Sequence, residues 1–219
     1  MGSPQAVLRV IGLEVAYPRS SKRFVYPDIA IARGRCVCIS GSTGCGKTTL
    51  LNSLFQPLFQ GSVGYSEVLL LGQDIRLYGP GIYRVMSYMP QYAQDGLNPV
   101  MTASAQLQTV LNGNRLALNP SEIEQALARL GLKPDILKLY PHQMSGGMKQ
   151  RLVLMMAYLK KPALMVLDEP SSAIDALTLR FMLDFLKSIK SEGIALMIVS
   201  HDLGFTRHIA DASITLETC

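Results

Sequence analysis

Three stretches of the chain are continuously hydrophobic and end in polar residues: CVCIS (36–40), ALMVLD (163–168) and ALMIVS (195–200). Continuous runs of this kind are typical of strands buried on both faces of a parallel sheet. Near the N-terminus, VLRVIGLEV (7–15) instead alternates, which predicts one half-buried strand. A last strand is expected at SITLE (213–217). The pattern therefore predicts a mostly parallel sheet and further β-structure at the N-terminus.

Helix signals occupy the segments between these strands. They predict helices over residues 46–56, 119–132, 145–161 and 174–193. The second has an asparagine N-cap, a proline at its first position and a glycine as its stop, the usual order along a helix. The fourth places one stripe of hydrophobic residues on a single face: Leu179, Met182, Leu183, Leu186 and Ile189. Strands that alternate with helices predict an α/β fold.

Composition and charge narrow the class of protein. The chain has 219 residues, of which 48% are hydrophobic, so it can bury a sizeable core. Its uninterrupted apolar runs fall far short of the roughly 18 residues that a membrane-spanning helix requires. The N-terminal residues resemble no secretion signal, and the four cysteines show no zinc-ligand spacing. Without a secretion signal, we expect a cytosolic protein. The net charge of +5 is scattered, so we expect no binding of nucleic acid.

The segment after the first buried strand carries a phosphate-binding pattern, Gly41-x-x-x-x-Gly46-Lys47-Thr48, with a predicted helix behind it. Glycines allow consecutive N–H groups to turn toward phosphate oxygens, and the helix N-terminus adds positive potential. Lys47 would reach the β- and γ-phosphates, and the Thr48 hydroxyl would complete the coordination of Mg²⁺. The predicted nucleotide-binding residues of this loop are Gly41, Ser42, Thr43, Gly44, Cys45, Gly46, Lys47, Thr48 and Thr49.

Two acidic residues end the second buried strand. Asp168 would hold Mg²⁺, and Glu169 would accept a proton from the water that attacks the γ-phosphate. A strand that runs into a solvated turn could show the same two residues. The carboxyl ends of parallel strands meet at one edge of a sheet, however, so these carboxylates are expected beside the phosphate-binding loop.

About 120 residues separate Thr48 from Asp168, which is too many for a simple crossover and predicts an inserted lobe. Near its end, MSGGMKQRL (144–152) places a serine and two glycines at a helix start. This repeats the arrangement of a cap hydroxyl, bare backbone and a helix dipole that face an anion. Two such anion-binding helix starts in one chain suggest that ATP is held between two molecules.

The phosphate-binding loop, MSGGMKQR, VLDEPSSAID and VSHDLG, in this order, resemble the nucleotide-binding subunit of ATP-binding cassette (ABC) transporters. YPHQMSGGMKQR and the Q-x5-LNP segment (91–99) are similar to those of uptake systems for oligopeptides, dipeptides, nickel and metal chelates. Peptide-type members usually continue beyond the position of Cys219, so the resemblance leaves the cargo open among these classes.

This resemblance implies roles for residues outside the phosphate-binding loop. Tyr17 matches the aromatic residue that stacks on adenine, although Phe24 and Tyr26 lie near enough in sequence to be alternatives. Gln91 matches the loop glutamine that senses Mg²⁺ and the attacking water, and His201 matches the histidine that holds the γ-phosphate.

The signature segment is implied to act on the partner subunit's nucleotide. Ser145, Gly146 and Gly147 would contact the γ-phosphate that the partner holds, and Asp175 matches the loop that communicates across the dimer. The implied catalytic residues are Lys47, Gln91, Glu169 and His201, and the implied Mg²⁺ ligands are Thr48, Gln91 and Asp168.

The implied fold is a P-loop NTPase core with a mostly parallel sheet, an N-terminal antiparallel β region and an inserted α-helical subdomain. Residues 1–219 would form one ABC ATPase domain, with 1–90 and 161–219 as the core and 91–160 as the helical subdomain. The implied cofactors are ATP and Mg²⁺. The implied partners are a second ATPase subunit, identical or a sister chain, membrane permease subunits and an extracytoplasmic solute-binding protein.

The implied function is ATP hydrolysis that drives import through dimer closure, at the cytoplasmic face of the inner or plasma membrane. A short permease helix would dock near residues 91–101. The alternative is a non-transport ABC ATPase that serves as a scaffold or regulator in a soluble complex or on nucleic acid. DNA-repair members carry long heptad arms, which the inserted segment lacks, and scaffolds often lose the catalytic residues that are present here.

Overall fold

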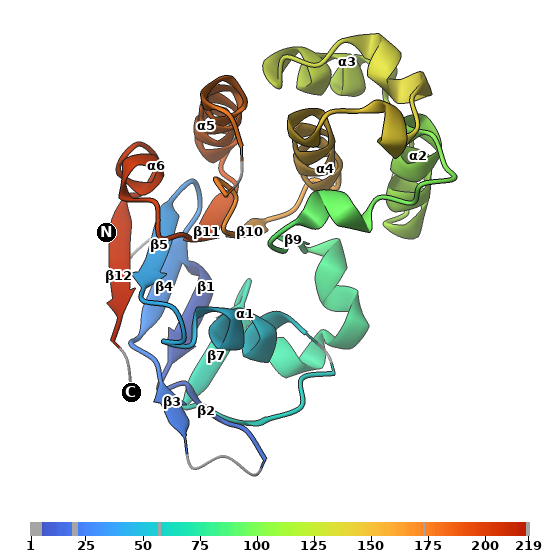
Figure 1. The fold of residues 1–219 in the computed structure, drawn as a ribbon. Coiled ribbons are helices and arrows are strands. Elements are labelled where there is room, and N and C mark those ends of the chain that lie inside the picture. The colour runs from blue at the N-terminus through green and yellow to red at the C-terminus, as the bar shows by residue number, and fades with distance from the viewer. Residues whose placement is uncertain (1–5, 19–21, 57, 173, 218–219) are drawn as a thin grey trace.

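The computed structural model describes residues 6–18, 22–56, 58–172 and 174–217 (Figure 1). Its strands are β1 Ala6–Ile11, β2 Glu14–Ala16, β3 Arg23–Val25, β4 Ile29–Ala32, β5 Cys36–Gly41, β6 Ser62–Gly64, β7 Glu67–Leu70, β8 Gln73–Asp74, β9 Met86–Met89, β10 Leu164–Asp168, β11 Ala195–Val199 and β12 Ala212–Leu216. Its α-helices are α1 Lys47–Phe55, α2 Ala103–Gly113, α3 Pro120–Arg129, α4 Gly146–Leu159, α5 Ala176–Ser191 and α6 Leu203–Arg207. Short 3₁₀ helices lie at Ile75–Leu77, Gly79–Arg84, Ala93–Gly96, Pro134–Lys138 and Pro141–Gln143.

The central sheet is parallel and has the strand order β12-β5-β11-β10-β9. The three continuous hydrophobic runs form β5, β10 and β11, which confirms the predicted parallel sheet. All residues of β10 and β11 are buried, because both faces of the sheet are covered. In register, Leu167 lies opposite Ile198 of β11 and Met89 of β9. The residues that follow these strands are therefore delivered to one edge of the sheet.

The prediction of one strand over residues 7–15 is wrong, because the segment contributes to two different sheets. β1 pairs in the antiparallel sheet β4-β1-β7-β8, whereas β2 pairs in the antiparallel sheet β3-β2-β6. Gly12 lies between them with a φ of 61°, a left-handed conformation that ends the first strand. A Cβ atom at Gly12 would lie 2.8 Å from Ser66 Oγ, so the close approach also favours glycine. The predicted N-terminal antiparallel region is confirmed.

The four predicted helices are confirmed as α1, α3, α4 and α5, with ends that differ by a few residues. The second was predicted to stop at Gly131, and α3 does end just before it, at Arg129, with Gly131 in a left-handed conformation at a φ of 62°. Helix α2 was missed. Its signals were present in the sequence, because Thr102 caps it through its side chain and Ala103, Leu107 and Leu111 are its buried stripe.

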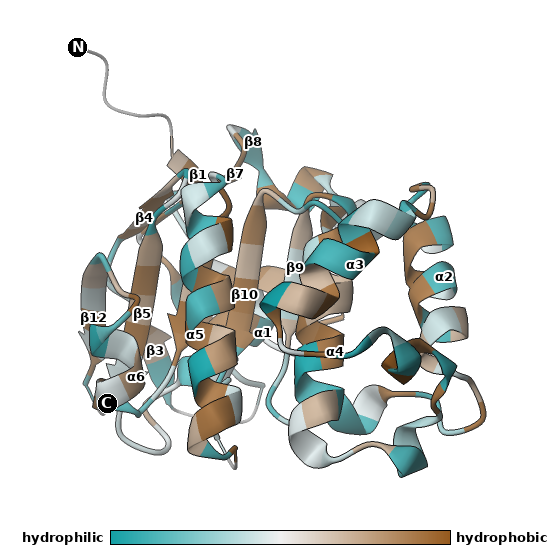
Figure 2. Cartoon of the chain, turned by 90° about the horizontal axis from the view of Figure 1, so that it is seen from above, coloured by the Kyte–Doolittle hydropathy of each residue, from teal (hydrophilic) through white to brown (hydrophobic). Residues whose placement is uncertain are grey.

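Two hydrophobic cores lie on opposite faces of the parallel sheet. Strand β5 shows how one strand serves both, since successive side chains point to opposite faces. Cys36 and Cys38 belong to the core beneath α2–α5, whereas Val37 and Ile39 belong to the core that includes α1 and the antiparallel strands. Figure 1 shows α1 between the parallel sheet and the antiparallel sheet that contains β1 and β7. Figure 2 shows the brown, hydrophobic strands behind α5.

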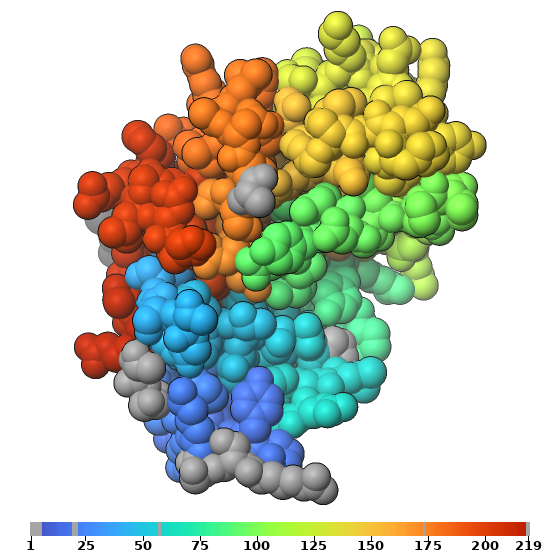
Figure 3. Space-filling model, viewed as in Figure 1, coloured from blue at the N-terminus to red at the C-terminus, as the bar shows by residue number. Residues whose placement is uncertain are grey.

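Helices α2, α3 and α4 are inserted between β9 and β10 and form a lobe beside the sheet (Figure 1). In the space-filling view this lobe, green to yellow, lies above the blue and cyan N-terminal part of the chain (Figure 3). The inserted helical lobe is thus confirmed. Across the described ranges, the helices are all too short or too polar to cross a membrane.

Candidate functional site

The loop between β5 and α1 has the geometry of the predicted phosphate-binding loop. Gly46 is the N-cap of α1 in a left-handed conformation, with a φ of 100°, and no side chain caps the helix. The first N–H groups of α1 are therefore open to a ligand. Lys47 Nζ folds back over the loop and donates to the carbonyl oxygens of Gly41 at 2.7 Å and Ser42 at 3.0 Å. This lysine is positioned where it can exchange those carbonyls for phosphate oxygens.

A cavity of about 380 Å³ opens over this loop. It brings together side chains from segments that lie far apart in the sequence, because β5, β9, β10 and β11 all end at this edge of the sheet. Its lining residues are Phe24, Thr43, Gly44, Gly46, Lys47, Thr48, Thr49, Gln91, Asp168, Glu169 and His201. The structure thus places all four predicted catalytic residues and all three predicted Mg²⁺ ligands in one cavity.

Glu169 and His201 contact each other at the cavity wall. Glu169 Oε2 lies 2.8 Å from His201 Nδ1, and it also accepts the backbone N–H of His201 at 3.3 Å. The Glu169 side chain is 10% exposed and that of His201 is 70% exposed, so the carboxylate is enclosed while the imidazole faces the opening. A carboxylate and an imidazole in contact can hold or move a proton at this position.

Asp168 is buried beside Glu169, and its ionised form is disfavoured there. Burial and the charge of Glu169 raise the pKa of Asp168 to about 6, and the positive charge of Lys47 opposes the shift. A buried carboxylate near like charge is disfavoured unless a cation joins it. The donor set of this cavity includes hydroxyl, amide and carboxylate oxygens from Thr48, Gln91 and Asp168, which suits a hard cation such as Mg²⁺.

We expect Asp168→Asn to stabilise the nucleotide-free protein at pH 7 by about 1–2 kcal/mol, after allowance for solvent screening. The pKa of Asp168 is higher in the folded chain than its usual 3.8, so the ionised form weakens the fold above about pH 6. The cost disappears as the pH falls from 6 toward 4. Chemical unfolding at several pH values, without Mg²⁺, measures the difference between variant and wild type. A difference that stays constant over this range would exclude the predicted burial cost.

Cys45, Gly41 and Ser42 were also predicted to bind nucleotide, but they do not line the cavity. The Cys45 side chain is buried, and a Cβ atom at Gly41 would lie 2.6 Å from its sulfur. The Cys45 side chain therefore packs in the core beneath the loop and not on its cavity side. Gly41 and Ser42 contribute the carbonyl groups that hold Lys47.

The aromatic residues near the loop occupy three different environments. Phe24 lines the cavity, and a Cβ atom at Gly46 would lie 2.5 Å from its ring. Tyr26 is buried and donates its hydroxyl to the Gly46 carbonyl at 2.9 Å. The Tyr17 hydroxyl lies 3.2 Å from the hydroxyl of Thr49, just outside the lining. The assignment of Tyr17 to adenine stays a prediction.

Sequence reasoning missed one cation of this region. Lys22 Nζ donates to the Gly44 carbonyl at 3.3 Å and lies 5.0 Å from the centre of the Phe24 ring. Lys22 lies just before β3, outside the strand, so no strand periodicity could have predicted this contact. It adds positive charge at the edge of the phosphate-binding loop.

The signature segment lies outside this cavity within the same chain. Ser145 caps α4 and accepts the N–H of Met148 at 3.2 Å. A Cβ atom added at Gly146 would have no neighbouring atom within 4 Å. A Cβ atom added at Gly147 would lie 2.5 Å from Thr178 Oγ1. Asp175 caps α5 and accepts the N–H of Thr178. The predicted contribution of Ser145, Gly146, Gly147 and Asp175 to a nucleotide site therefore requires another chain.

Comparison with known proteins identifies a family to which this chain is similar. The ABC transporter family model matches residues 27–172. The dipeptide transport ATP-binding protein DppD of Caldanaerobacter subterraneus is 32% identical over 84% of this chain and 60% of its own length. The probable peptide ABC transporter ATP-binding protein y4tS of Sinorhizobium fredii is 32% identical over 93% of this chain and 62% of its own length.

A solved structure agrees at the level of the fold. It is the dimeric, post-hydrolysis state of an ATP-binding cassette bound to ADP and Pi, with a TM-score of 0.80 and 23% identity, over 96% of each chain. The chain spans about 60% of the length of the two curated relatives named above. By the extent of the family match and the sequence identity to the two transport ATP-binding proteins, this chain belongs to the ABC transporter family.

Proposed function

We propose that this chain is the ATP-hydrolysing subunit of an ABC importer for peptides, nickel or metal chelates. The observation that carries the proposal is the single cavity that joins the phosphate-binding loop to Gln91, Asp168, Glu169 and His201. The relatives named above are peptide or dipeptide transport ATP-binding proteins, which supports the peptide class.

The cavity suits ATP with Mg²⁺. The glycine-rich loop and the open N-terminus of α1 offer N–H donors to phosphate oxygens, and Lys47 offers a full positive charge. When bound, Mg²⁺ would neutralise phosphate charge, with Thr48, Gln91 and Asp168 as its protein ligands. Glu169 would accept the proton of the attacking water, and His201 would hold the γ-phosphate. Phosphoryl transfer depends mainly on such positioning and charge stabilisation.

We propose further that two chains close on ATP, each offering its cavity to the signature segment of the other. Ser145 and Gly146 lie at the exposed N-terminus of α4, outside the chain's own cavity. A helix N-terminus with bare backbone attracts an anion. Only the closed pair would contact the γ-phosphate from both sides, so ATP favours closure and hydrolysis allows separation. The partner chain is a second copy or a sister subunit.

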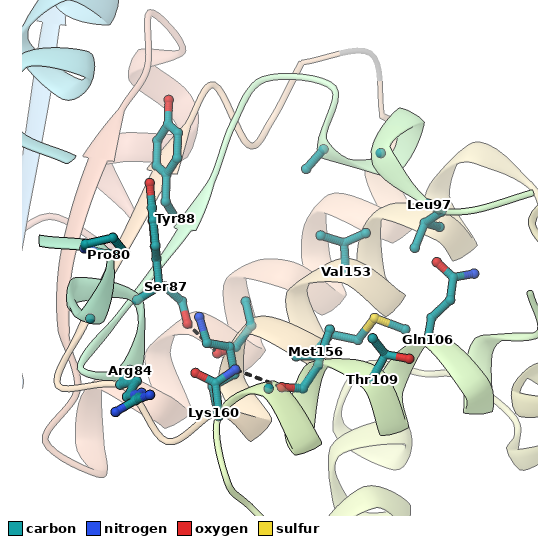
Figure 4. A pocket seen from close by; sticks show the side chains of 18 residues that line it. Pro80, Arg84, Ser87, Tyr88, Leu97, Gln106, Thr109, Val153, Met156 and Lys160 are labelled. Atoms are coloured by element: carbon teal, nitrogen blue, oxygen red, sulfur yellow. Dashed lines mark hydrogen bonds between the residues drawn. The ribbon is translucent and has the colours of Figure 1, made fainter. Parts of the chain in front are cut away.

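Transport requires membrane subunits, and a second cavity offers a place for them. This cavity of about 630 Å³ lies between the 3₁₀ helix at Gly79–Arg84, strand β9, the segment of residues 93–97 and helices α2 and α4 (Figure 4). Arg84 and Lys160 lie on its wall, and none of the described residues that line it is acidic. A short permease helix with an acidic side chain fits this charge. The chain would then sit on the cytoplasmic face of the membrane, with a solute-binding protein on the far side.

We expect a cysteine at Thr109 to cross-link to a membrane subunit. Thr109 is exposed on α2 and lines the cavity, whereas Ser104 is exposed on the same helix and does not line it. Thr109→Cys and Ser104→Cys, each combined with Cys219→Ser, are treated with a short cross-linker in native membranes and analysed by mass spectrometry. The proposal predicts a permease adduct at least tenfold stronger at residue 109. Equal labelling at both positions, or adducts only with soluble proteins, would remove the support for docking in this cavity.

A further inference from the structure

Gln150 is a buried polar residue of α4 that faces the end of strand β10. Its side chain is part of a residue only 6% exposed, and its Nε2 donates to the carbonyl oxygen of Pro170 at 2.7 Å. A buried amide that lost this partner would carry a desolvation cost, so the bond holds α4 and the turn after β10 together. The proposed chemistry assigns no role to Gln150.

The turn that Gln150 contacts holds Glu169 in an uncommon backbone conformation. Glu169 has a φ of 49°, in the left-handed region that residues with a Cβ atom usually avoid. Its N–H donates to the Val199 carbonyl at 2.8 Å, and its own carbonyl accepts from the Ser172 hydroxyl at 2.8 Å. Pro170 follows without an N–H, so its backbone can anchor the turn only through its carbonyl, which is the group that Gln150 binds.

This conformation decides where the Glu169 carboxylate points. With the turn closed, Oε2 lies 2.8 Å from His201 Nδ1 at the cavity wall. A relaxed backbone at Glu169 would rotate the side chain away, because φ sets the direction of the Cα–Cβ bond relative to β10. The bond from Gln150 therefore acts on the carboxylate without touching it.

The same helix makes a second contact with the segment after β10. Gly147, at the start of α4, approaches Thr178 so closely that a Cβ atom would lie 2.5 Å from Thr178 Oγ1. That hydroxyl donates to Asp175 Oδ2 at 2.8 Å, at the N-terminus of α5. Helix α4 thus touches both ends of the segment 170–178, through Gln150 at one end and Gly147 at the other.

We propose that Gln150 is a positioning residue that ties the placement of helix α4 to the orientation of the Glu169 carboxylate. The inference rests on the proposed function, in which Glu169 is the base and the N-terminus of α4 serves the partner's ATP. A chain whose α4 is seated aligns its own base, and a chain whose α4 is displaced binds ATP without aligning it. In each chain of the proposed dimer, the placement of α4 thereby controls the alignment of Glu169 at the hydrolysis site of the same chain.

Gln150→Met tests this, since methionine keeps the length and volume of the side chain but cannot donate. We expect kcat for ATP hydrolysis to fall about 10- to 100-fold, because a small displacement of a catalytic group has effects of this size. The KM for ATP and the affinity for a fluorescent ATP analogue should stay within twofold. Tyr158→Phe is the matched control, because it removes side-chain hydrogen bonds at the other end of α4, to Arg129 and Glu192. Its kcat should stay within twofold.

Gln150→Glu adds a readout that a packing role would not give. The protonated carboxyl can donate to the Pro170 carbonyl, whereas the carboxylate cannot. The ratio of the kcat of this variant to that of the wild type should therefore rise as the pH is lowered from 8 to 6. Thermal unfolding shows that each variant is folded at the assay temperature.

Two results would overturn the proposal while leaving the ATPase assignment intact. One is an unchanged kcat in Gln150→Met, and the other is a ratio for Gln150→Glu that does not vary with pH. Parallel losses of kcat, nucleotide affinity and melting temperature would also assign Gln150 to packing alone. A wild-type chain that binds ATP but shows no hydrolysis in complex with its partners would instead overturn the proposed function.

Discussion

Replacing Glu169 by glutamine is expected to reduce ATP hydrolysis by about 10²- to 10⁴-fold while ATP still binds, because glutamine cannot accept the proton of the attacking water. The variant keeps the shape of the enclosed side chain at the cavity wall. ATP would then remain between the two chains, and a stable dimer should accumulate. Phosphate release measures the first effect, and light scattering coupled to size-exclusion chromatography measures the second.

Glu192→Gln provides the control for Glu169→Gln. Glu192 lies next to the C-terminus of α5, pairs with Arg129 at 2.7 Å and does not line the cavity over the phosphate-binding loop. Its turnover should match that of the wild type, without an ATP-dependent dimer. Turnover by Glu169→Gln above a tenth of the wild-type rate would assign the base to another group. A monomer in saturating Mg-ATP, with a cognate sister chain present, would contradict the shared nucleotide site.

Replacing Lys47 by alanine is expected to weaken ATP binding by about 30- to 150-fold, which corresponds to the ~2–3 kcal/mol of hydrogen bonds to a charged group. Lys47 supplies a positive charge to the cavity, and the phosphate-binding loop holds its ammonium group through the Gly41 and Ser42 carbonyls. Hydrolysis should fall with binding. Titration with a fluorescent ATP analogue measures the affinity.

Lys187→Ala serves as the control for charge alone, because Lys187 is exposed on α5 and does not line the cavity. Its affinity for ATP should equal that of the wild type. Thermal unfolding separates loss of the ligand contact from loosening of the loop. If Lys47→Ala keeps the wild-type affinity, the phosphate-binding assignment is wrong.

Much of the fold could be predicted because its signals are local. β11 is hydrophobic along its whole length and β10 up to its last residue, Asp168, and the structure buries every one of their residues. The stripe predicted for α5 faces the core: Met182, Leu186 and Ile189 are fully buried, and Leu179 and Leu183 are partly buried against the same cluster. Phe185 is buried as well and was not in the predicted stripe. The ring of Tyr158 of α4 packs edge-on against it, at a centroid distance of 5.1 Å.

The N-terminal segment shows where local patterns fail. Its alternation continues on both sides of Gly12, and a glycine within an alternating pattern is compatible with one strand or with two. Which strand pairs with β1 and which with β2 depends on residues far along the chain, in β4, β7, β3 and β6. Sheet membership is a long-range property, so the alternation could not predict the change of sheet.

The candidate site divides in the same way. The loop from Gly41 to Thr49 was recognisable because its chemistry requires glycines and a lysine at a fixed spacing. Cys45 fits that spacing and yet faces the core, because the turn of the loop directs its side chain behind the backbone. For Tyr17, Phe24 and Tyr26 the sequence left three choices, and the structure gives each ring different neighbours.

The sequence by itself determined the α/β pattern, the phosphate-binding loop and the identities of the groups that could do chemistry. They follow from the spacing of residues and from runs of similar residues, because local backbone geometry alone links such patterns to helices, strands and loops. Only the tertiary structure decided which groups meet: Glu169 with His201, Gln150 with Pro170, and the signature segment apart from the chain's own cavity. The reason is that strand order and register, set by the burial of whole faces, bring together residues whose separation along the chain says nothing about their distance.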